Sequence, residues 1–256
     1  MEKRHVNLSV NVNKIALLRN SRGGNIPNVI QFAKRCEQLM VDGITVHPRP
    51  DARHIRYSDV RELKMNLKRE LNVEGYPSEE FMKLVLEEHP AQVTLVPDAP
   101  GDLTSHEGWN VKKNFDFLSD VVGKLRRAGI RTSIFIFPEE EDVENAAKLG
   151  ADRVELYTEA YAENYKKDKK AAIQPYCRAA SYAESCNIGV NAGHGLCLEN
   201  LRFFRQQIPN LEEVSVGHGL ITEALYLGIE ETISNYKSCL GEGRSKLVDF
   251  SLSSGM

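Results

Sequence analysis

The sequence predicts an α/β protein of the (β/α)8 TIM-barrel class with a few extra short helices. Its 256 residues match the usual length of one such barrel. Eight short apolar segments alternate with segments of helical periodicity, as parallel strands alternate with their crossover helices. The last two predicted strands are followed by glycine-flanked histidines, in Gly193-His194-Gly195 and Gly217-His218-Gly219. Barrels of this class commonly bind phosphate at these two positions, where backbone N–H groups are free to meet an anion.

The first half of the chain contains four of the predicted strands, at residues 7–11, 43–47, 71–75 and 91–96. Asn28 is the expected cap of the helix between the first two, and further helices begin near Ser58 and Pro77. The first strand is followed by Val12-Asn13-Lys14 and then by a basic loop at residues 19–24, where glycines and charges gather. The longest predicted loop covers residues 97–110.

The second half contains the other four strands, at residues 132–137, 153–157, 188–190 and 214–216. Helices are predicted at residues 115–128, 139–149, 198–207 and 221–240. Gly150 should end the second of these. Pro175 lies in the stretch 160–186, which we expect to be one kinked helix or two short ones. No change in composition suggests a second domain, so residues 1–240 should form one barrel, with 241–256 as a loosely ordered tail.

Composition excludes several classes of protein. The formal net charge of -3 gives no support to nucleic-acid binding. No apolar run reaches the length of a membrane span or resembles a signal peptide, so we expect a cytoplasmic protein without membrane association. The 5 cysteines show no CxxC spacing, which argues against a disulfide framework or a structural zinc site.

Polar side chains follow most of the predicted strands, at the end of the barrel where active sites lie. They are Asn11, His47, Glu74, Thr104, Glu155, His194 and His218. His194 is the strongest candidate, because its flanking glycines should leave the ring exposed and meet no evident packing need. Glu74 ends an apolar strand, where partial burial would raise its pKa and make it a base near neutral pH. A structural ion pair of Glu74 with Arg49 or Arg22 is the alternative.

Basic residues gather in the loops expected at the same end of the barrel: Lys14, Arg19, Arg22, Arg49 and Arg53. In a chain that is slightly negative overall, this local positive charge predicts an anionic, phosphorylated substrate. A solvated basic rim is the alternative. We predict no catalytic metal, because no carboxylate lies at ligand spacing from a histidine on one element.

The chain resembles the pyridoxine 5′-phosphate synthase family, the barrel enzymes that close the pyridine ring of vitamin B6, from about Leu8 to Leu240. The motifs that carry the resemblance are Val10-Asn-Val-Asn-Lys-Ile-Ala-Leu-Leu-Arg-Asn-Ser-Arg-Gly23, Asp42-Gly-Ile-Thr-Val-His-Pro-Arg49, Arg53-His-Ile55, Leu71-Asn-Val-Glu74, Leu95-Val-Pro97, Val190-Asn-Ala-Gly-His-Gly195 and Val216-Gly-His218. They coincide with the strand ends selected above. The family condenses 3-amino-2-oxopropyl phosphate with 1-deoxy-D-xylulose 5-phosphate, releasing phosphate and water, without metal or organic cofactor.

The resemblance implies a role for each matching residue. His47 and Glu74 would be general bases, His194 the proton donor and Glu155 a stabiliser of a transition state. Residues implied to hold the amino-ketone phosphate are Asn11, Arg22, Gly195, Gly217 and His218, and those implied to hold the deoxyxylulose phosphate are Arg49, His54 and Thr104.

The chain departs from the family pattern at Asn13 and Lys14, where many members have Asp-His. An amide cannot carry charge, and an ammonium replaces a titratable imidazole. We expect both residues to bind substrate, with Lys14 pairing with a phosphate. The resemblance also implies a homo-octamer, in which an arginine from a neighbouring subunit could complete a site.

Two other functions fit parts of the pattern. An aldolase- or isomerase-type proton transfer on a single sugar phosphate would need only Glu74 and His194. A phosphate-ligand sensor would need the basic loops but no cluster of acid–base groups. The loops 97–110 and 48–55 are the candidate lids over the reaction.

Overall fold

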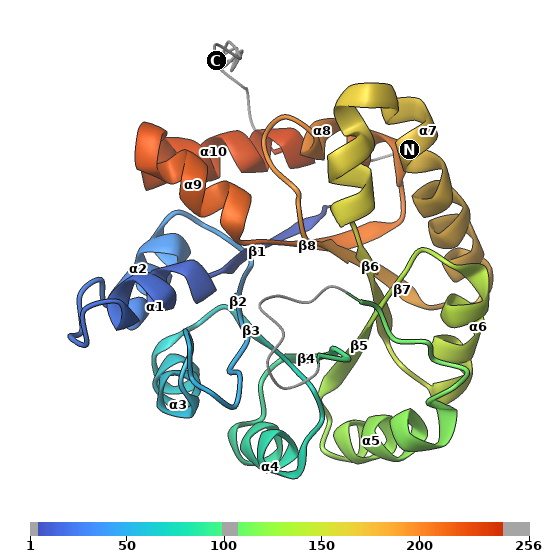
Figure 1. The fold of residues 1–256 in the computed structure, drawn as a ribbon, viewed down its shortest axis with the longest axis horizontal. Coiled ribbons are helices and arrows are strands. Elements are labelled where there is room, and N and C mark those ends of the chain that lie inside the picture. Colours follow the sequence, from blue (N-terminus) through green and yellow to red (C-terminus); the bar gives the residue numbers. More distant parts are fainter. Residues whose placement is uncertain (1–4, 99–106, 243–256) are drawn as a thin grey trace.

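The structure, a computed structural model that describes residues 5–98 and 107–242, is the predicted barrel (Figure 1). Its parallel strands close in sequence order, with β1 pairing to both β2 and β8. Helices surround the strands as an outer layer (Figure 1). Thr104, most of the candidate lid 97–110 and nearly all of the predicted tail lie outside the described residues. The predicted fold class is confirmed.

The elements alternate along the chain as expected. The strands are β1 (Asn7–Asn11), β2 (Gly43–Val46), β3 (Glu70–Gly75), β4 (Gln92–Leu95), β5 (Arg131–Ile136), β6 (Arg153–Tyr157), β7 (Gly189–Gly193) and β8 (Leu211–Val216). The helices are α1 (Asn13–Asn20), α2 (Val29–Gln38), α3 (Tyr57–Asn66), α4 (Glu79–Glu88), α5 (Phe115–Arg127), α6 (Glu140–Leu149), α7 (Glu159–Ser185), α8 (Leu201–Gln207), α9 (His218–Leu227) and α10 (Ile229–Leu240).

Local sequence signals fix several helix ends. The Asn28 side chain accepts a hydrogen bond from the backbone N–H of Gln31 at 2.8 Å and so caps α2, as predicted. Ser78 caps α4 in the same way, accepting from the N–H of Phe81 at 3.2 Å. Gly150 ends α6 with a φ of 80°, a left-handed conformation that glycine adopts without strain.

The interior of the barrel is polar, whereas the outward faces of the strands are apolar and pack against the helices. A buried chain of side chains crosses four strands: Ser9 and Thr45 hydroxyls lie 2.6 Å apart, Asn72 donates to Thr45 at 3.3 Å, and Thr94 donates to Asn72 at 3.1 Å. Because each of these four side chains has a partner, this chain of hydrogen bonds avoids the cost of unsatisfied burial.

A charged network fills the barrel nearer the amino ends of the strands. The Glu213 carboxylate accepts from the Gln92 side chain at 3.0 Å and lies 3.7 Å from the guanidinium of Arg153. Arg131 donates to Gln92 at 2.8 Å and forms an ion pair with Glu70. This network, called the lower layer below, pairs its carboxylates with arginines.

Three element predictions were wrong or incomplete. Residues 13–20 form α1, a helix that was not predicted and that includes the first two residues of the expected loop 19–24, because burial of Ile15 and Ala16 outweighs the local polar composition. The helix predicted at residues 221–240 is two helices, α9 and α10, divided at Gly228 with a φ of 77°. Strand β7 extends to Gly193, so that Asn191, expected in the turn, lies buried in the barrel.

The break in α7 lies at Asp168 rather than at Pro175. Asp168 has non-helical backbone angles, with φ of −155° and ψ of 91°. Its carboxylate accepts from the backbone N–H groups of Lys170 and Ala171, each at 3.0 Å, and so caps a second helical segment. The expected division is therefore present, but a capping aspartate produces it.

Candidate functional site

A cavity of about 380 Å³ opens at the carboxyl ends of the strands. It is lined by Asn11, Asn13, Lys14, Leu17, His47, Arg49, Arg53, His54, Glu74, His194, Gly195, Leu196, Ser215, Val216, Gly217, His218 and Gly219. Most of the site residues predicted from the sequence are among them. We call this space the catalytic cavity.

Glu74 and His47 face each other in the cavity wall, both buried. Glu74 Oε2 lies 3.9 Å from His47 Nδ1, and the Asn11 amide donates to the same oxygen at 3.4 Å. Burial raises the pKa of Glu74 to about 8, and the neighbouring Asp98 carboxylate adds to the rise. Burial, together with the positive charge of Arg49, holds the pKa of His47 well below its usual range. The imidazole is therefore neutral at pH 7 and can accept a proton, whereas Glu74 can accept one only after it has lost its own, as the pH rises through about 8. No ion pair joins Glu74 to Arg49 or Arg22 among the described residues.

Glu155 lies deeper, in β6. Its Oε2 accepts a long hydrogen bond from Thr94 at 3.5 Å, whereas Oε1 is buried with no hydrogen-bond partner among the described residues. Burial and the nearby Glu74 carboxylate hold the pKa of Glu155 well above its usual range. A buried carboxyl without compensation costs stability, which is typical of a functional position.

His194 follows β7 in a strained conformation. Its φ of 76° and that of Gly195, 69°, place two consecutive residues in the left-handed region. The His194 ring packs against Phe135 and Tyr157, with centroids 5.0 and 5.4 Å away. The expectation of an exposed ring was therefore wrong, because these aromatic side chains cover part of it.

The glycine before His194 meets a packing need that the sequence did not reveal. A Cβ at Gly193 would lie 2.1 Å from Glu155 Oε1, and one at Gly195 would lie 2.7 Å from the Cβ of Ala162. The absence of a side chain at Gly193 therefore leaves room for the Glu155 carboxyl. The glycine-rich turn and Glu155 depend on each other.

One wall of the cavity is formed by the start of α9. Gly217 precedes the helix and His218 is its first residue. The first N–H groups of a helix have no intrahelical acceptor and carry partial positive charge, which suits an anion such as phosphate. A Cβ at Gly217 would lie 3.1 Å from the Asn11 Cβ, so glycine allows this turn to approach β1 closely.

A second part of the lining is basic. Lys14 comes from α1, and Arg49, Arg53 and His54 come from the loop after β2. Burial and the neighbouring Arg49 charge lower the pKa of His54 to about 4, so that its ring is neutral at pH 7. The Asn13 side chain holds the loop after β2 by accepting from the backbone N–H of His47 at 2.9 Å. The catalytic cavity thus combines two groups of candidate anion-binding residues with buried titratable side chains.

Two arginines predicted at the barrel mouth lie elsewhere. Arg19 is buried and forms two hydrogen bonds with the Asp59 carboxylate, at 2.6 and 2.8 Å, so its role is structural. Arg22 lies on the exposed turn after α1 and does not line the catalytic cavity.

Sequence reasoning missed Asp98, which is buried after β4 and pairs with Arg49. The available signal was its place, because it directly follows Leu95-Val-Pro97 at a strand end. The polar side chains inside the barrel, such as Gln92 and Glu213, were not predicted either.

The fold and site together define a (β/α)8-barrel protein with a cavity at the carboxyl ends of its strands that is lined by buried titratable side chains and by basic residues. The family described as pyridoxal phosphate biosynthesis protein PdxJ matches residues 8–242, and the chain belongs to this family. The resemblance drawn from the motifs is confirmed.

Relatives named pyridoxine 5′-phosphate synthase match nearly the full length of the chain. The protein from Bacteroides fragilis is 59% identical over 233 residues, covering 91% of this chain and 98% of its own. That from Parabacteroides distasonis is 58% identical over 234 residues, with the same coverage. Among solved structures, 3-keto-L-gulonate-6-phosphate decarboxylase from Vibrio cholerae superposes with a TM-score of 0.65 at 11% identity, covering 93% of this chain and 98% of its own. That likeness concerns the fold alone.

Proposed function

We propose that the chain is a pyridoxine 5′-phosphate synthase. It condenses 3-amino-2-oxopropyl phosphate with 1-deoxy-D-xylulose 5-phosphate to pyridoxine 5′-phosphate, phosphate and water, as a transferase-type enzyme without metal. The observation that carries the proposal is the meeting of Glu74, His47 and His194 in one cavity with two groups of candidate anion-binding residues. The relatives' shared name supports the same activity.

The acid–base residues have separate tasks in this proposal. Ring closure moves protons at several atoms, more than one side chain can reach. Glu74 and His47 are general bases, since one has a raised pKa and the other is a neutral imidazole. His194 donates a proton, and Glu155 stabilises positive charge that develops in a transition state.

The two substrate phosphates bind to two different groups of residues in the lining of the cavity. Asn11, Gly195, Gly217 and His218 hold the amino-ketone phosphate, where the α9 N-terminus supports the geometry. Arg49, His54, Asn13 and Lys14 hold the deoxyxylulose phosphate, together with Thr104. Charge-assisted hydrogen bonds from guanidinium and ammonium groups suit this task.

Arg22 belongs to the proposed homo-octamer. Because it lies on an exposed turn outside its own cavity, we place it in the site of a neighbouring subunit. Exposed apolar side chains on neighbouring α1 and α9 support self-association: Leu18 is 56% exposed, Leu225 76% and Tyr226 80%. We further propose that residues 1–240 are one domain and that the protein is cytoplasmic. No helix in the described part of the chain is long and apolar enough to cross a membrane.

Mass spectrometry tests the reaction directly. Purified protein is incubated with both freshly made substrates and a chelator, and parallel samples each omit one substrate. Pyridoxine 5′-phosphate and inorganic phosphate should form in equal amounts, and only when both substrates are present. Product formation in chelator also tests the proposed independence from metal.

Other outcomes would contradict the proposal in different ways. Conversion of one sugar phosphate alone would indicate an isomerase or aldolase. Binding of a single ligand in thermal-shift assays, with no turnover of any mixture, would indicate a sensor.

A further inference from the structure

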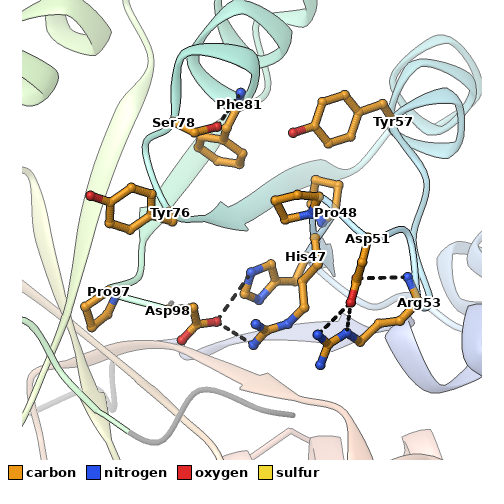
Figure 2. Close-up of a pocket in the computed structure, with 12 residues that line it drawn as sticks. His47, Pro48, Asp51, Arg53, Tyr57, Tyr76, Ser78, Phe81, Pro97 and Asp98 are labelled. Atoms are coloured by element: carbon orange, nitrogen blue, oxygen red, sulfur yellow. Dashed lines mark hydrogen bonds and ion pairs between the residues drawn. The ribbon is translucent and has the colours of Figure 1, made fainter. Parts of the chain in front are cut away.

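Asp98 stands directly behind two residues of the catalytic cavity. It follows Pro97 at the carboxyl end of β4, and its side chain is only 5% exposed. Figure 2 shows a neighbouring pocket of about 430 Å³, which Asp98 lines together with His47 and Arg49, and in it the Asp98 carboxylate is turned toward His47. Asp98 itself does not line the catalytic cavity.

His47 lies between two carboxylates. Its Nε2 is 3.6 Å from Asp98 Oδ2, and its Nδ1 is 3.9 Å from Glu74 Oε2. A carboxylate on one ring nitrogen keeps the proton there and leaves the other nitrogen able to accept one. Asp98 therefore favours the tautomer protonated at Nε2, with Nδ1 turned toward Glu74.

Arg49 uses the same oxygen of Asp98. Its Nη2 donates to Asp98 Oδ2, and the two side chains are 6% and 5% exposed. A guanidinium this buried needs an anionic partner, and the pairing fixes the direction of the planar group. We propose that Asp98 is a positioning residue, whose single carboxylate orients both the imidazole of His47 and the guanidinium of Arg49 for the reaction.

This role rests on the proposed function and links its two halves, because His47 serves proton transfer and Arg49 serves phosphate binding. Within the described part of the chain, the other charged or titratable groups near His47 are Arg53, His54 and His194, so that Asp98 supplies the negative charge beside the ring and Glu74 adds to it only when deprotonated. The Asp98 charge also helps to raise the pKa of Glu74. Removal of the Asp98 charge should therefore affect His47, Arg49 and Glu74 together.

The test is the Asp98→Asn variant of the full chain, with Asp51→Asn as matched control. Asp51 pairs with Arg53 on the same loop but is 51% exposed and does not line the catalytic cavity. Asp98→Asn should lower kcat at least about tenfold and raise the KM for deoxyxylulose phosphate about tenfold, and Asp98→Glu should restore part of both. The acidic limb of the pH–rate profile should move to lower pH by about one unit, because Glu74 loses a neighbouring negative charge. Asp51→Asn should change none of these.

A second measurement is independent of turnover. In protein labelled with ¹⁵N-histidine, the imidazole signal that disappears in His47→Gln should report a proton on Nε2, and Asp98→Asn should shift it toward a mixture of tautomers. If the wild type makes no product, the proposed function fails, and the NMR result still decides the positioning role. An active wild type with an unshifted pH limb and an unchanged His47 signal in folded Asp98→Asn would overturn the inference.

Discussion

The barrel contains two layers of buried carboxyl groups, the lower layer defined above and an upper layer formed by Glu74 and Glu155. They differ in whether an arginine forms an ion pair with the carboxyl. In the lower layer, Glu213 accepts from Gln92 and lies near Arg153. In the upper layer, Glu74 and Glu155 make no ion pair with an arginine or lysine among the described residues. Burial raises the pKa of all three carboxyls. The next causes for Glu213 are Arg153 and Arg131, which oppose the rise. For Glu74 the next cause is a neighbouring carboxylate, with Arg49 opposing it less strongly, and for Glu155 the next causes are carboxylates. Burial alone therefore does not mark the carboxyls of the proposed site, and the absence of an ion pair with an arginine does.

Two buried arginine–aspartate pairs repeat this lesson. Arg19 and Asp59 satisfy each other and join α1 to α3, away from the catalytic cavity. Arg49 and Asp98 form a similar pair, but Arg49 also lines the cavity and the Asp98 oxygen also faces His47. One pair is structural, and the other positions groups for the proposed reaction.

The largest difference between the two layers is expected when one glutamate in each is replaced by glutamine. Glu74→Gln should lower kcat about 10³-fold, because a general base is removed, while the melting temperature is preserved. Glu213→Gln should leave kcat within about threefold and lower stability by about 1–3 kcal/mol, because Arg153 loses the more deeply buried of its two carboxylate partners and keeps Glu212. Steady-state kinetics and thermal denaturation of both variants check this. Equal losses of turnover would remove the distinction between the layers.

A substitution of Arg153, the cation that pairs with Glu213, is a second test of the lower layer. Arg153→Met should destabilise the fold by about 3 kcal/mol, because the buried Glu213 loses its ion pair and keeps only the weaker effect of Arg131. Urea denaturation measures the loss, and activity per folded molecule should stay close to that of the wild type. Unchanged stability would show that the arginine does not compensate the carboxylate.

A smaller effect is expected at the basic part of the cavity lining. Lys14→Met should raise the KM for deoxyxylulose phosphate about tenfold with little change in kcat, because one charge-assisted contact to phosphate is lost. Lys34→Met is the matched control, since the Lys34 ammonium binds Asn66 on the outer surface, where it is exposed. The same increase in both variants would point to the general field of the protein and not to a contact.

The pattern of apolar and polar residues in the sequence was sufficient to predict the barrel and most of the residues that line the cavity. Strand ends are set by local alternation and by turn residues, so the sequence alone places His47, Glu74 and His218 at the same end of the barrel. The α1 helix could not be foreseen, because burial of Ile15 and Ala16 depends on tertiary contacts.

The parts that were missed depend on contacts between distant strands. Gly193 makes room for Glu155, which lies on the neighbouring strand β6. Asp98 can be recognised as part of the site only from its contacts with Arg49 and His47, which lie in the segment after β2. Neither relation leaves a spacing signal along the chain.

The pH dependence of kcat/KM for deoxyxylulose phosphate in the wild type tests the central claim most directly, namely that a buried carboxyl without an ion pair acts as the base. Since Glu74 must lose its proton to act, kcat/KM should rise with pH through a midpoint near the pKa of about 8 and flatten above it. Titration of the substrate phosphates, near about 6, lies below this range. A limb centred close to the ordinary glutamate value of about 4.3 would contradict the account.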